Sequence, residues 1–386
     1  MIAYNRTWLD ALLTTDLAKQ WHEKGLVSDE RLRSVQEQYR TGFYSPNVFV
    51  RIGLGIFGLI LIGAVLGLII LMVSPDSEEA TALFGMFCGA GFIVVLETVL
   101  IRKNHHYGSG LDDVLLYAGT MCFLSGLCSL LPDNADVLAY SCVSLPFLVI
   151  GAIRYLDRLM TAAAFICALM IVLLTLKETL DTSAVYIMPF IAMLFSAGVY
   201  YFAGKGMRQT GRHYWEACFG VLAFLSLLTF YAGGNYWVVQ QAGWDMLALE
   251  QPAMPWLFWA FTFAIPVFYI FQGLRRKDRL LLDVGIGCAV AAVFTFRFYF
   301  HVFSLAWVAT IGGAVLFVIS YLSIRYLRSR PDLSYTYETD GKRSLLQKAQ
   351  EQIFDQTIAG QATPAPAAKT DMGGGQFGGG GAGSEF

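Results

Sequence analysis

The sequence predicts an all-α fold, a polytopic membrane helix bundle of about ten transmembrane helices. Three observations lead to this prediction. Long apolar stretches follow one another between residues 52 and 322, hydrophobic residues make up 56% of the chain against 15% charged ones, and the connecting loops alternate between basic and almost free of basic residues. With a mean hydropathy of +0.54, the composition is that of a membrane protein and excludes an ordinary soluble globule.

Residues 1–50 are polar and predict a small cytoplasmic helical hairpin. We expect Thr7 to cap the first helix, Gly25 to end it and Ser28 to cap the second. Apolar side chains recur on one face of each helix: Leu13, Leu17 and Trp21 in the first, then Leu32, Val35 and Tyr39 in the second. Two short helices bury too little surface to be stable alone. The hairpin is therefore expected to rest on its own bundle, on a second copy of the chain, or on another protein.

Residues 51–328 form the expected transmembrane domain. A hydrocarbon core of roughly 30 Å is crossed by about 20 helical residues, and ten stretches approach that length. They are Ile52 to Val73, Thr81 to Ile101, Val114 to Leu131, Val137 to Ile153, Leu159 to Leu176, Tyr186 to Ala203, Ala217 to Ala232, Trp256 to Phe271, Leu280 to Phe298 and Leu305 to Leu322. Glycines such as Gly85, Gly89 and Gly91 allow spanning helices to pack closely, whatever the function.

Lysine and arginine are segregated between the loops. The loops after even-numbered spans hold eleven of these residues, whereas the loops after odd-numbered spans hold only Lys177. The eleven are Arg102, Lys103, Arg154, Arg158, Lys205, Arg208, Arg212, Arg275, Arg276, Lys277 and Arg279. Short cytoplasmic loops carry the excess of basic residues in membrane proteins. The pattern therefore predicts that both termini lie in the cytoplasm.

A cytoplasmic segment, residues 329–358, is expected after the last span, with a short amphipathic helix from Arg343 to Ile358. The following residues, 359–386, are first rich in Ala and Pro and then rich in Gly, which predicts a disordered tail. Two aromatic residues, Phe377 and Phe386, interrupt the glycines. The tail is either a plain flexible linker or a peptide that lays these two side chains into the groove of a protein partner.

Charged residues inside the spans are few, and each is costly enough in a membrane to be a candidate for function. Glu97 lies about one turn before the cytoplasmic end of the second span. It either reaches toward the interface, near the basic residues that follow it, or serves as a buried functional carboxylate. Asp112 and Asp113 start the third span, where carboxylates suit a helix N-terminus. Asp283 follows Arg279 at the spacing of an ion pair on one helix face.

Arg297 is the most unusual candidate, because it lies near the outer end of the ninth span, where other basic residues are missing. Three interpretations remain open. The side chain snorkels to the outer head groups with its stem among aromatic residues, binds an anionic group from outside, or pairs with a carboxylate of a neighbouring helix. His301, one turn further on, is either an interfacial histidine or a ligand, although no second histidine stands at metal-ligand spacing.

Catalytic signatures are missing from the sequence. We find no Gly-x-Ser-x-Gly, His-Glu-x-x-His, P-loop or dinucleotide-binding pattern, and these are the motifs that would announce the common chemistries. The seven cysteines all fall inside predicted spans without a Cys-x-x-Cys pair. We therefore expect no catalytic residue, no metal site and no cofactor, and no contact with nucleic acid.

The start of the chain resembles a known family. The segment WHEKGLVSDERLRSVQEQY, followed by the Gly-rich first span IGLGIFGLILIGAVLGLIIL, is similar to the beginning of the bacterial predicted-membrane-protein family called domain of unknown function 2157. The resemblance covers about the first 75 residues. It implies a helical hairpin before many hydrophobic spans and a place in the bacterial cytoplasmic (inner) membrane. It implies no activity and no catalytic residues.

Two classes of function fit these features. The first is a non-enzymatic scaffold or accessory subunit of a membrane complex, which would meet a protein partner through the N-terminal hairpin and the C-terminal tail. The second is a secondary transporter of a small solute, built from two halves of five helices with inverted topology. The second class expects an enclosed polar cavity at mid-depth and interrupted helices, for which the spans offer only Pro146, Pro189 and Pro266.

Overall fold

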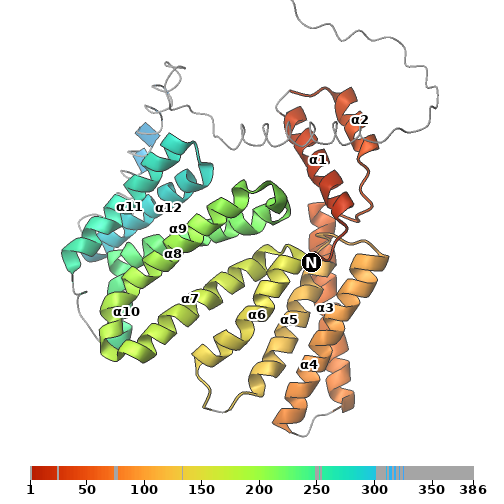
Figure 1. Cartoon of the computed structure of the whole chain (residues 1–386), viewed down its shortest axis with the longest axis horizontal. Coiled ribbons are helices and arrows are strands. Elements are labelled where there is room, and N and C mark those ends of the chain that lie inside the picture. The colour runs from red at the N-terminus through yellow and green to blue at the C-terminus, as the bar shows by residue number, and fades with distance from the viewer. Residues whose placement is uncertain are drawn as a thin grey trace, which may run out of the picture. The chain divides into compact units, whose positions relative to one another are not determined.

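The computed structural model is helical throughout the part of the chain that it describes, which confirms the predicted all-α fold (Figure 1). The described residues are 2–23, 26–73, 77–132, 134–247, 252 and 254–300, together with positions 310, 313, 314, 317, 318, 321 and 325. Most of the expected tenth span, the segment 329–358 and the tail 359–386 lie outside the described residues, and so does Gly25.

Two short helices precede the membrane domain, as predicted: α1 (Arg6–Glu23) and α2 (Asp29–Gln38). The predicted cap of α1 is wrong by two residues. The side-chain oxygen Asn5 Oδ1 accepts hydrogen bonds from Thr7 N at 3.0 Å and from Thr7 Oγ1 at 2.7 Å. Asn5 therefore does the capping, and Thr7 lies inside the first turn. Asparagine is one of the preferred N-cap residues, so the sequence offered two neighbouring caps and the helix begins at the earlier one.

Ser28 does stand at the N-cap of α2, although its hydroxyl makes no capping hydrogen bond. The apolar stripe predicted for this helix, Leu32, Val35 and Tyr39, is half-buried, and the helix contains no fully buried residue. It packs on α1, so α2 forms the outer layer of the hairpin. The charged face of α2 is exposed.

Nine segments of the described chain are helices that are long and apolar enough to cross a membrane. They correspond to the first nine predicted spans. They are α3 (Val48–Val73), α4 (Glu78–Val95) with its continuation η1 (Leu96–Lys103), α5 (Leu111–Ser129), α6 (Val137–Tyr155), α7 (Arg158–Leu180), α8 (Ala184–Arg208), α9 (Glu216–Gly234), α11 (Pro255–Arg276) and α12 (Arg279–Phe300). The helical turns of η1 are wider than those of an α-helix, because η1 is a π-helix.

Three further helical segments connect the spans: the 3₁₀ turns η2 (Asp181–Ser183) and η3 (Thr210–Trp215), and the helix α10 (Tyr236–Leu247). The sequence did not predict α10, which occupies a connection that was expected to be a loop. With 12 residues, α10 is too short to cross a hydrocarbon core. It packs against α8, α9 and α11.

Helices that are consecutive in the chain pack side by side: α4 with α5, α6 with α7, α8 with α9, and α11 with α12 (Figure 1). Glycines bring the first pair close. A Cβ atom added to Gly85 or Gly89 of α4 would meet the backbone of α5. Gly91, in contrast, has open space where its Cβ would be. The predicted role in close packing is thus confirmed for Gly85 and Gly89 and wrong for Gly91, which faces away from α5.

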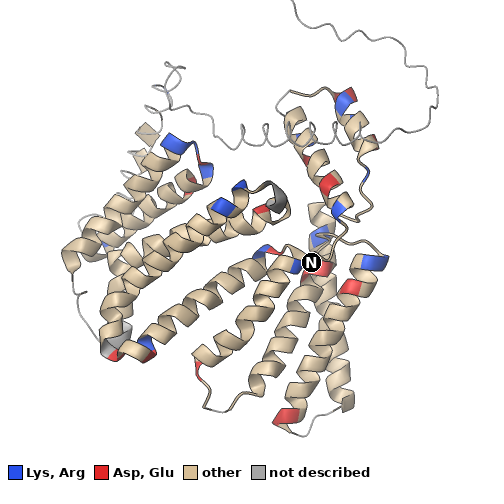
Figure 2. Cartoon of the chain, in the orientation of Figure 1, with Lys and Arg blue, Asp and Glu red and all other residues tan. Residues whose placement is uncertain are grey.

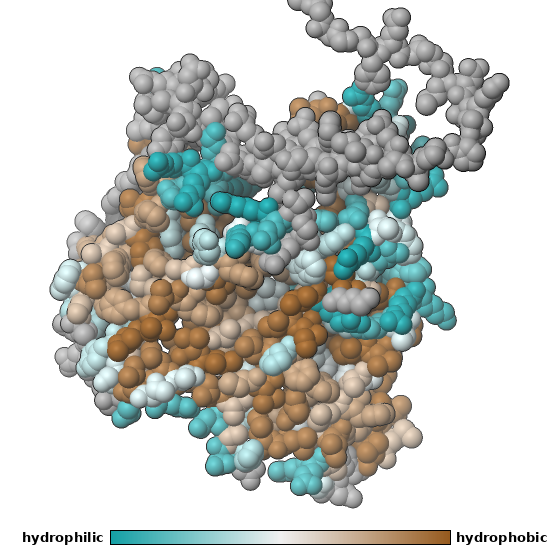
Figure 3. All heavy atoms as spheres, viewed as in Figure 1, coloured by the Kyte–Doolittle hydropathy of each residue, from teal (hydrophilic) through white to brown (hydrophobic). Residues whose placement is uncertain are grey.

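Basic side chains share one end of the bundle, which we call the basic end (Figure 2). They occupy the last turns of η1, α6, α8 and α11. The opposite end carries Glu78 and Glu79 at the start of α4, and the basic residues at its described span termini are Lys177 in the last turn of α7 and Arg297 in the last turn of α12. Between the ends the visible surface is largely hydrophobic (Figure 3), as expected for side chains that face lipid.

Candidate functional site

The strongest polar contact between spanning helices is an ion pair at the basic end. Glu97, in the first turn of η1, faces Arg154, in the last turn of α6. The distances are 2.6 Å from Arg154 Nε to Glu97 Oε1 and 2.7 Å from Nη2 to Oε2, and Tyr155 Oη donates to Oε1 at 2.7 Å. The side chains of Glu97 and Arg154 are only 20% and 33% exposed. A bidentate pair of this kind fixes both the distance and the angle between two helices.

Glu97 lies at the start of a π-helix. A π turn holds more residues than an α turn, so it rotates the residues that follow it around the helix axis. Glu97 lies where the wider turns begin. Short π segments inside α-helices occur frequently at functional sites, and here the carboxylate at the start of the segment meets a residue 57 positions further along the chain.

A second carboxylate, Asp112, organises the loop before α5. It is 2% exposed. Its oxygens accept from Gly108 N at 2.7 Å, from Ser109 N at 2.9 Å, from Ser109 Oγ at 3.1 Å and from Asp113 N at 3.0 Å. His106 Nδ1 lies 2.8 Å from Ser109 Oγ. Burial lowers the pKa of His106 below its ordinary value, and the nearby Asp112 opposes this shift. The loop is thus held by a buried carboxyl group that its own N–H groups surround.

The same loop is fastened to the start of α3. Arg51 Nη2 lies 2.6 Å from Asp113 Oδ2. Gly110 approaches the Arg51 carbonyl so closely that an added Cβ would collide with it, and the φ angle of Gly110 is +88°. Only glycine adopts such a conformation without strain. The predicted helix N-terminus at Asp112 and Asp113 is therefore present, and the two carboxylates have different partners.

The turn between α6 and α7 joins two other helices. Asp157, the N-cap of α7, accepts from Met160 N at 2.7 Å with one oxygen and from Tyr117 Oη of α5 at 2.8 Å with the other. Trp215 Nε1, at the end of η3, donates to the Ile153 carbonyl at 3.0 Å. The last turn of α6 and the turn after it thus connect α5 with the segment that begins α9.

The N-terminal segment docks onto these contacts. Ala3 N donates to the Arg154 carbonyl at 2.9 Å. Asp10 Oδ1, on α1, lies 3.1 Å from His213 Nε2 and accepts from Tyr214 Oη at 2.8 Å. Of the three resting places expected for the hairpin, the structure shows the first: the segment before α2 packs on the chain's own bundle. We call this set of contacts, from the N-terminal segment to η1, the 104–113 loop, the α6–α7 turn and η3, the junction.

Aromatic rings fill the space between the N-terminal segment and the 104–113 loop. Tyr4 packs edge-on against Tyr107 with ring centroids 4.9 Å apart, and Phe43 stacks on Tyr107 at 5.1 Å. Trp8 packs edge-on against Phe43 and His105, at 5.4 and 4.7 Å. Burial raises the pKa of both Tyr4 and Tyr107 above the ordinary value. Both phenols therefore stay neutral.

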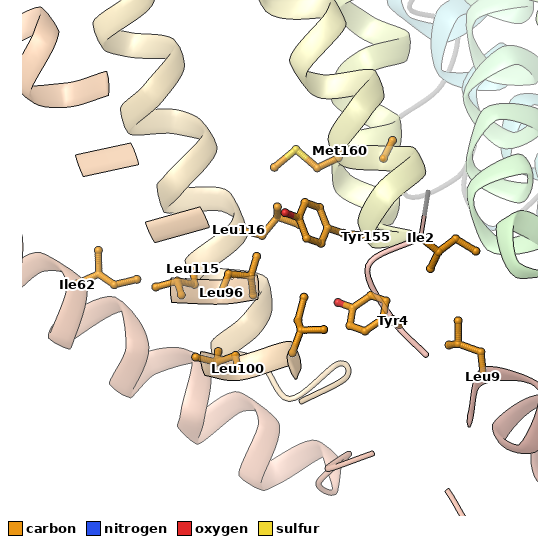
Figure 4. Packing of buried hydrophobic residues seen from close by; sticks show 12 residues of the cluster. Ile2, Tyr4, Leu9, Ile62, Leu96, Leu100, Leu115, Leu116, Tyr155 and Met160 are labelled. Atoms are coloured by element: carbon orange, nitrogen blue, oxygen red, sulfur yellow. The ribbon is translucent and has the colours of Figure 1, made fainter. Parts of the chain in front are cut away.

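An apolar cluster continues from these rings into the bundle (Figure 4). Its buried members from the N-terminal segment are Ile2, Tyr4 and Leu9. Those from the bundle include Ile62, Leu96, Leu100, Leu115, Leu116, Tyr155 and Met160. At about 25 cal/mol per Å² of apolar surface removed from water, burying three such side chains contributes several kcal/mol to docking. The polar contacts therefore fix where the N-terminal segment docks on the bundle, and apolar burial stabilises the docked state.

A small polar cavity of about 200 Å³ opens beside the ion pair. It is lined by Ile2, Ala3, Glu97, Ile101, Arg102 and Arg154. Glu97 forms its ion pair with Arg154 of α6 and not with Arg102, which lies five residues after Glu97 in the chain. Within the described residues, no three His, Cys, Asp or Glu side chains lie together in a way that would hold a metal ion.

A second buried polar cluster lies toward the opposite end and is uncharged. Asn235 Nδ2 donates to Tyr231 Oη at 2.9 Å and to Thr295 Oγ1 at 3.1 Å. Tyr236 N donates to Thr262 Oγ1 at 2.9 Å. All five residues are buried. They join α9, α10, α11 and α12 through hydrogen bonds between neutral groups.

The predicted site residues are not brought together. Glu97 belongs to the junction, whereas Arg297 lies in the last turn of α12, near the opposite end, with a half-exposed side chain. Its three interpretations remain open. His301, Phe377 and Phe386 lie outside the described residues. The Arg279–Asp283 pair is present, with 3.4 Å between Nε and Oδ2.

Sequence reasoning missed Arg154, Asp157 and Asn235 as contact-forming residues. Arg154 was counted among the loop basic residues, and nothing in its neighbourhood points to a carboxylate far away in the chain. Asn235 had one local signal, because an asparagine followed by aromatic and aliphatic residues is typical of a helix N-cap. Comparisons with protein-family models, with curated proteins and with solved structures found no match. The resemblance to domain of unknown function 2157 therefore stays a prediction.

Proposed function

We propose that the protein is a non-enzymatic scaffold or accessory subunit of a bacterial cytoplasmic membrane complex, with its basic end in the cytoplasm. The observation that carries this proposal is the junction. It attaches the N-terminal hairpin to the bundle through α1 and the preceding residues, while α2 remains on the outside without a buried residue. A charged helix held at a fixed place on a membrane protein is suited to bind a second protein.

The interior supports this proposal over transport. A cavity of about 210 Å³ between α7, α8, α9 and α10 is lined almost entirely by apolar side chains. Pro146, Pro189 and Pro266 lie inside α6, α8 and α11, and each helix continues through its proline. Transporters of the inverted-repeat type bind solutes at interrupted helices and polar midplane sites. The polar groups of the neutral cluster around Asn235 form hydrogen bonds with one another. They therefore offer few hydrogen-bond partners to a solute.

The orientation follows from the positive-inside rule, and cysteine labelling in intact cells tests it. Single cysteines at Ser77, Asn134 and Gln241 are expected to react with an impermeant maleimide from outside, and a cysteine at Gln209 is not. All four side chains are exposed. The seven native cysteines are first replaced by serine or alanine. If only the cysteine at position 209 is labelled from outside, the orientation is the opposite of the one proposed.

The scaffold proposal is tested by copurification from native membranes in mild detergent. We expect a stoichiometric partner with the wild-type chain, and its loss from a variant in which two exposed carboxylates of α2 are reversed, Glu30→Lys with Glu37→Lys. The matched control reverses two exposed carboxylates at the opposite end, Glu78→Lys with Glu79→Lys, and should keep the partner. If both variants keep the partner, or both lose it, α2 is not the docking face. Solute flux in vesicles that contain the purified protein alone would favour the transporter.

The tail provides a second possible contact. Phe377 and Phe386 are the residues there with the most apolar surface to bury. In the same copurification, a Phe377→Ala and Phe386→Ala double variant with unchanged expression should lose or weaken the partner. Full retention would leave the tail as a linker.

A further inference from the structure

An apolar groove between α9 and α12 ends at a cationic side chain. Its walls are Phe224 and Leu228 of α9 and Leu280, Val284 and Gly287 of α12, and Arg279 and Asp283 lie at one end. The groove has a volume of about 580 Å³, which is within the range of pockets that bind small molecules. It lies along the first half of α12, directly below the basic end.

The two helices turn a continuous face toward the groove. Phe224 and Leu228 are one helical turn apart on α9, and Gly220 lies one further turn back. A Cβ added at Gly220 or Gly287 would meet nothing within 4 Å. Phe224 and Leu228 are 44% and 39% exposed. This surface belongs to two helices that are long and apolar enough to cross a membrane, so what reaches it is hydrocarbon rather than water.

Arg279 gives the groove its polar end. Its side chain is 78% exposed, and within the described chain its polar partner is Asp283, itself 64% exposed, through one contact of 3.4 Å at Nε. An exposed pair of this kind contributes little, and it leaves the two terminal nitrogens of the guanidinium for another acceptor. In the planar guanidinium these nitrogens form a fork that can donate two parallel hydrogen bonds to the oxygens of a phosphate.

The turn before α12 adds further positive charge. Arg275, Arg276 and Lys277 precede Arg279, and Lys277 adopts φ +56°, which turns the chain sharply between α11 and α12. The other carboxylate here, Asp278, is engaged as a cap, since its Oδ1 accepts from the backbone N–H groups of residues 280 and 281. Residues 275–283, at the mouth of the groove, thus hold four basic residues against two carboxylates, a net positive charge.

We propose that this groove binds one anionic phospholipid, with an acyl chain along Phe224, Leu228 and Gly287 and its phosphate against Arg279. A long apolar slot with a cationic mouth at membrane-interface depth matches a molecule that is apolar over most of its length and negative at one end. Basic pockets between spanning helices on the cytoplasmic side hold such head groups in other membrane proteins. With the basic end in the cytoplasm, as proposed above, the lipid comes from the inner leaflet.

Native mass spectrometry of the full-length protein in dodecyl maltoside, with added phosphatidylglycerol or phosphatidylcholine, tests the site. The wild-type protein should retain one phosphatidylglycerol in preference to phosphatidylcholine. Arg279→Gln should weaken phosphatidylglycerol about fivefold, the effect of one basic residue near a lipid head group, and should leave phosphatidylcholine unchanged. Lys103→Gln, another basic residue at the same end, is the matched control and should change neither lipid.

Filling the groove provides the second arm. Gly287→Leu, or Gly220→Leu if the first variant fails to purify, should remove retention of both lipids. Gly91→Leu is the control, because its side chain also enters open space but on α4. The proposal is wrong if wild-type protein holds both lipids equally, or if the filled variants keep phosphatidylglycerol. A filled variant that loses thermal stability yet keeps the lipid would show that the lipid binds elsewhere and that the protein itself fills the groove.

Discussion

The two ends of the bundle are held together by different chemistry. At the basic end, Glu97 pairs with Arg154 and Arg51 with Asp113, so charged groups join segments about 60 residues apart. Toward the opposite end, Asn235 binds Tyr231 and Thr295 through neutral groups. Ions are costly to transfer into hydrocarbon, and much less costly near head groups and water. Charged pairs therefore join the helix ends at the basic end, beside the N-terminal segment, and neutral hydrogen bonds join the helices toward the opposite end.

The first way to break this contrast is to remove one member of the ion pair. Glu97→Gln leaves the Arg154 guanidinium half-buried without a carboxylate, and we expect a loss of about 2–3 kcal/mol in the free energy of unfolding. Unfolding in mixed micelles measures it. The exposed Lys103→Gln is the control. A double variant, Glu97→Gln with Arg154→Gln, should lose less than the sum of the two single losses, and an additive loss would show that the two side chains do not interact.

The second change acts on the loop conformation at the same end. Gly110→Ala forces a Cβ onto the Arg51 carbonyl at a φ of +88° and should cost about 2 kcal/mol. Gly91→Ala, in an open helical position, should be neutral or slightly stabilising because alanine favours helices. Thermal unfolding of the two purified variants gives the comparison. Equal melting temperatures would mean that the loop is free to adopt another conformation.

Changes in the neutral cluster should have smaller effects. Thr295→Val removes one hydrogen bond to Asn235 and should cost about 0.6 kcal/mol, the average for such bonds between spanning helices. Asn235→Ala should cost about 1 kcal/mol, because Asn235 Oδ1 also accepts from the first N–H groups of α10. The same unfolding assay measures both. A loss as large as that of Glu97→Gln would contradict the contrast between the two ends.

The smallest effect expected is a pH dependence from His106. Burial lowers its pKa in the folded protein, so the unfolded chain binds the proton more tightly. Its contribution to stability is present above about pH 6.5, the ordinary value of histidine, and is lost as the pH falls through the lower folded pKa. Wild-type protein should thus lose stability relative to His106→Gln on acidification. A difference that is constant between about pH 8 and about pH 5 would contradict this.

Much of this fold is predictable from sequence because spanning helices are local and long. Nine spans, the α2 cap at Ser28 and the Arg279–Asp283 pair depend on spacing within one helix. The helix α10 was not predicted, because its 12 residues are too few for a span, although Gly233, Gly234 and Asn235 before it are a turn and N-cap signal. The cap at Asn5 rather than Thr7 shows the usual limit at helix ends, where two good caps differ little in free energy.

The candidate site was harder to predict, since its members meet only in the fold. Glu97 was recognised as costly in a membrane, yet its partner Arg154 lies on a different helix, and the π-helix in which Glu97 lies has no local sequence signal. The docking of Asp10 on Tyr214 joins residues 204 positions apart. Contacts of this range depend on how helices are ordered around the bundle, and a single sequence does not contain that order.

The most direct test of the junction is the coupling between its two most distant members. A double-mutant cycle with Asp10→Asn and Tyr214→Phe, followed by unfolding in mixed micelles, isolates the contact at 2.8 Å. If the N-terminal segment rests on the bundle as described, the effects of the two changes should differ from additivity by about 0.5 kcal/mol or more. Additivity within about 0.3 kcal/mol would show that α1 and η3 do not touch in the membrane, and the junction would then not hold the hairpin.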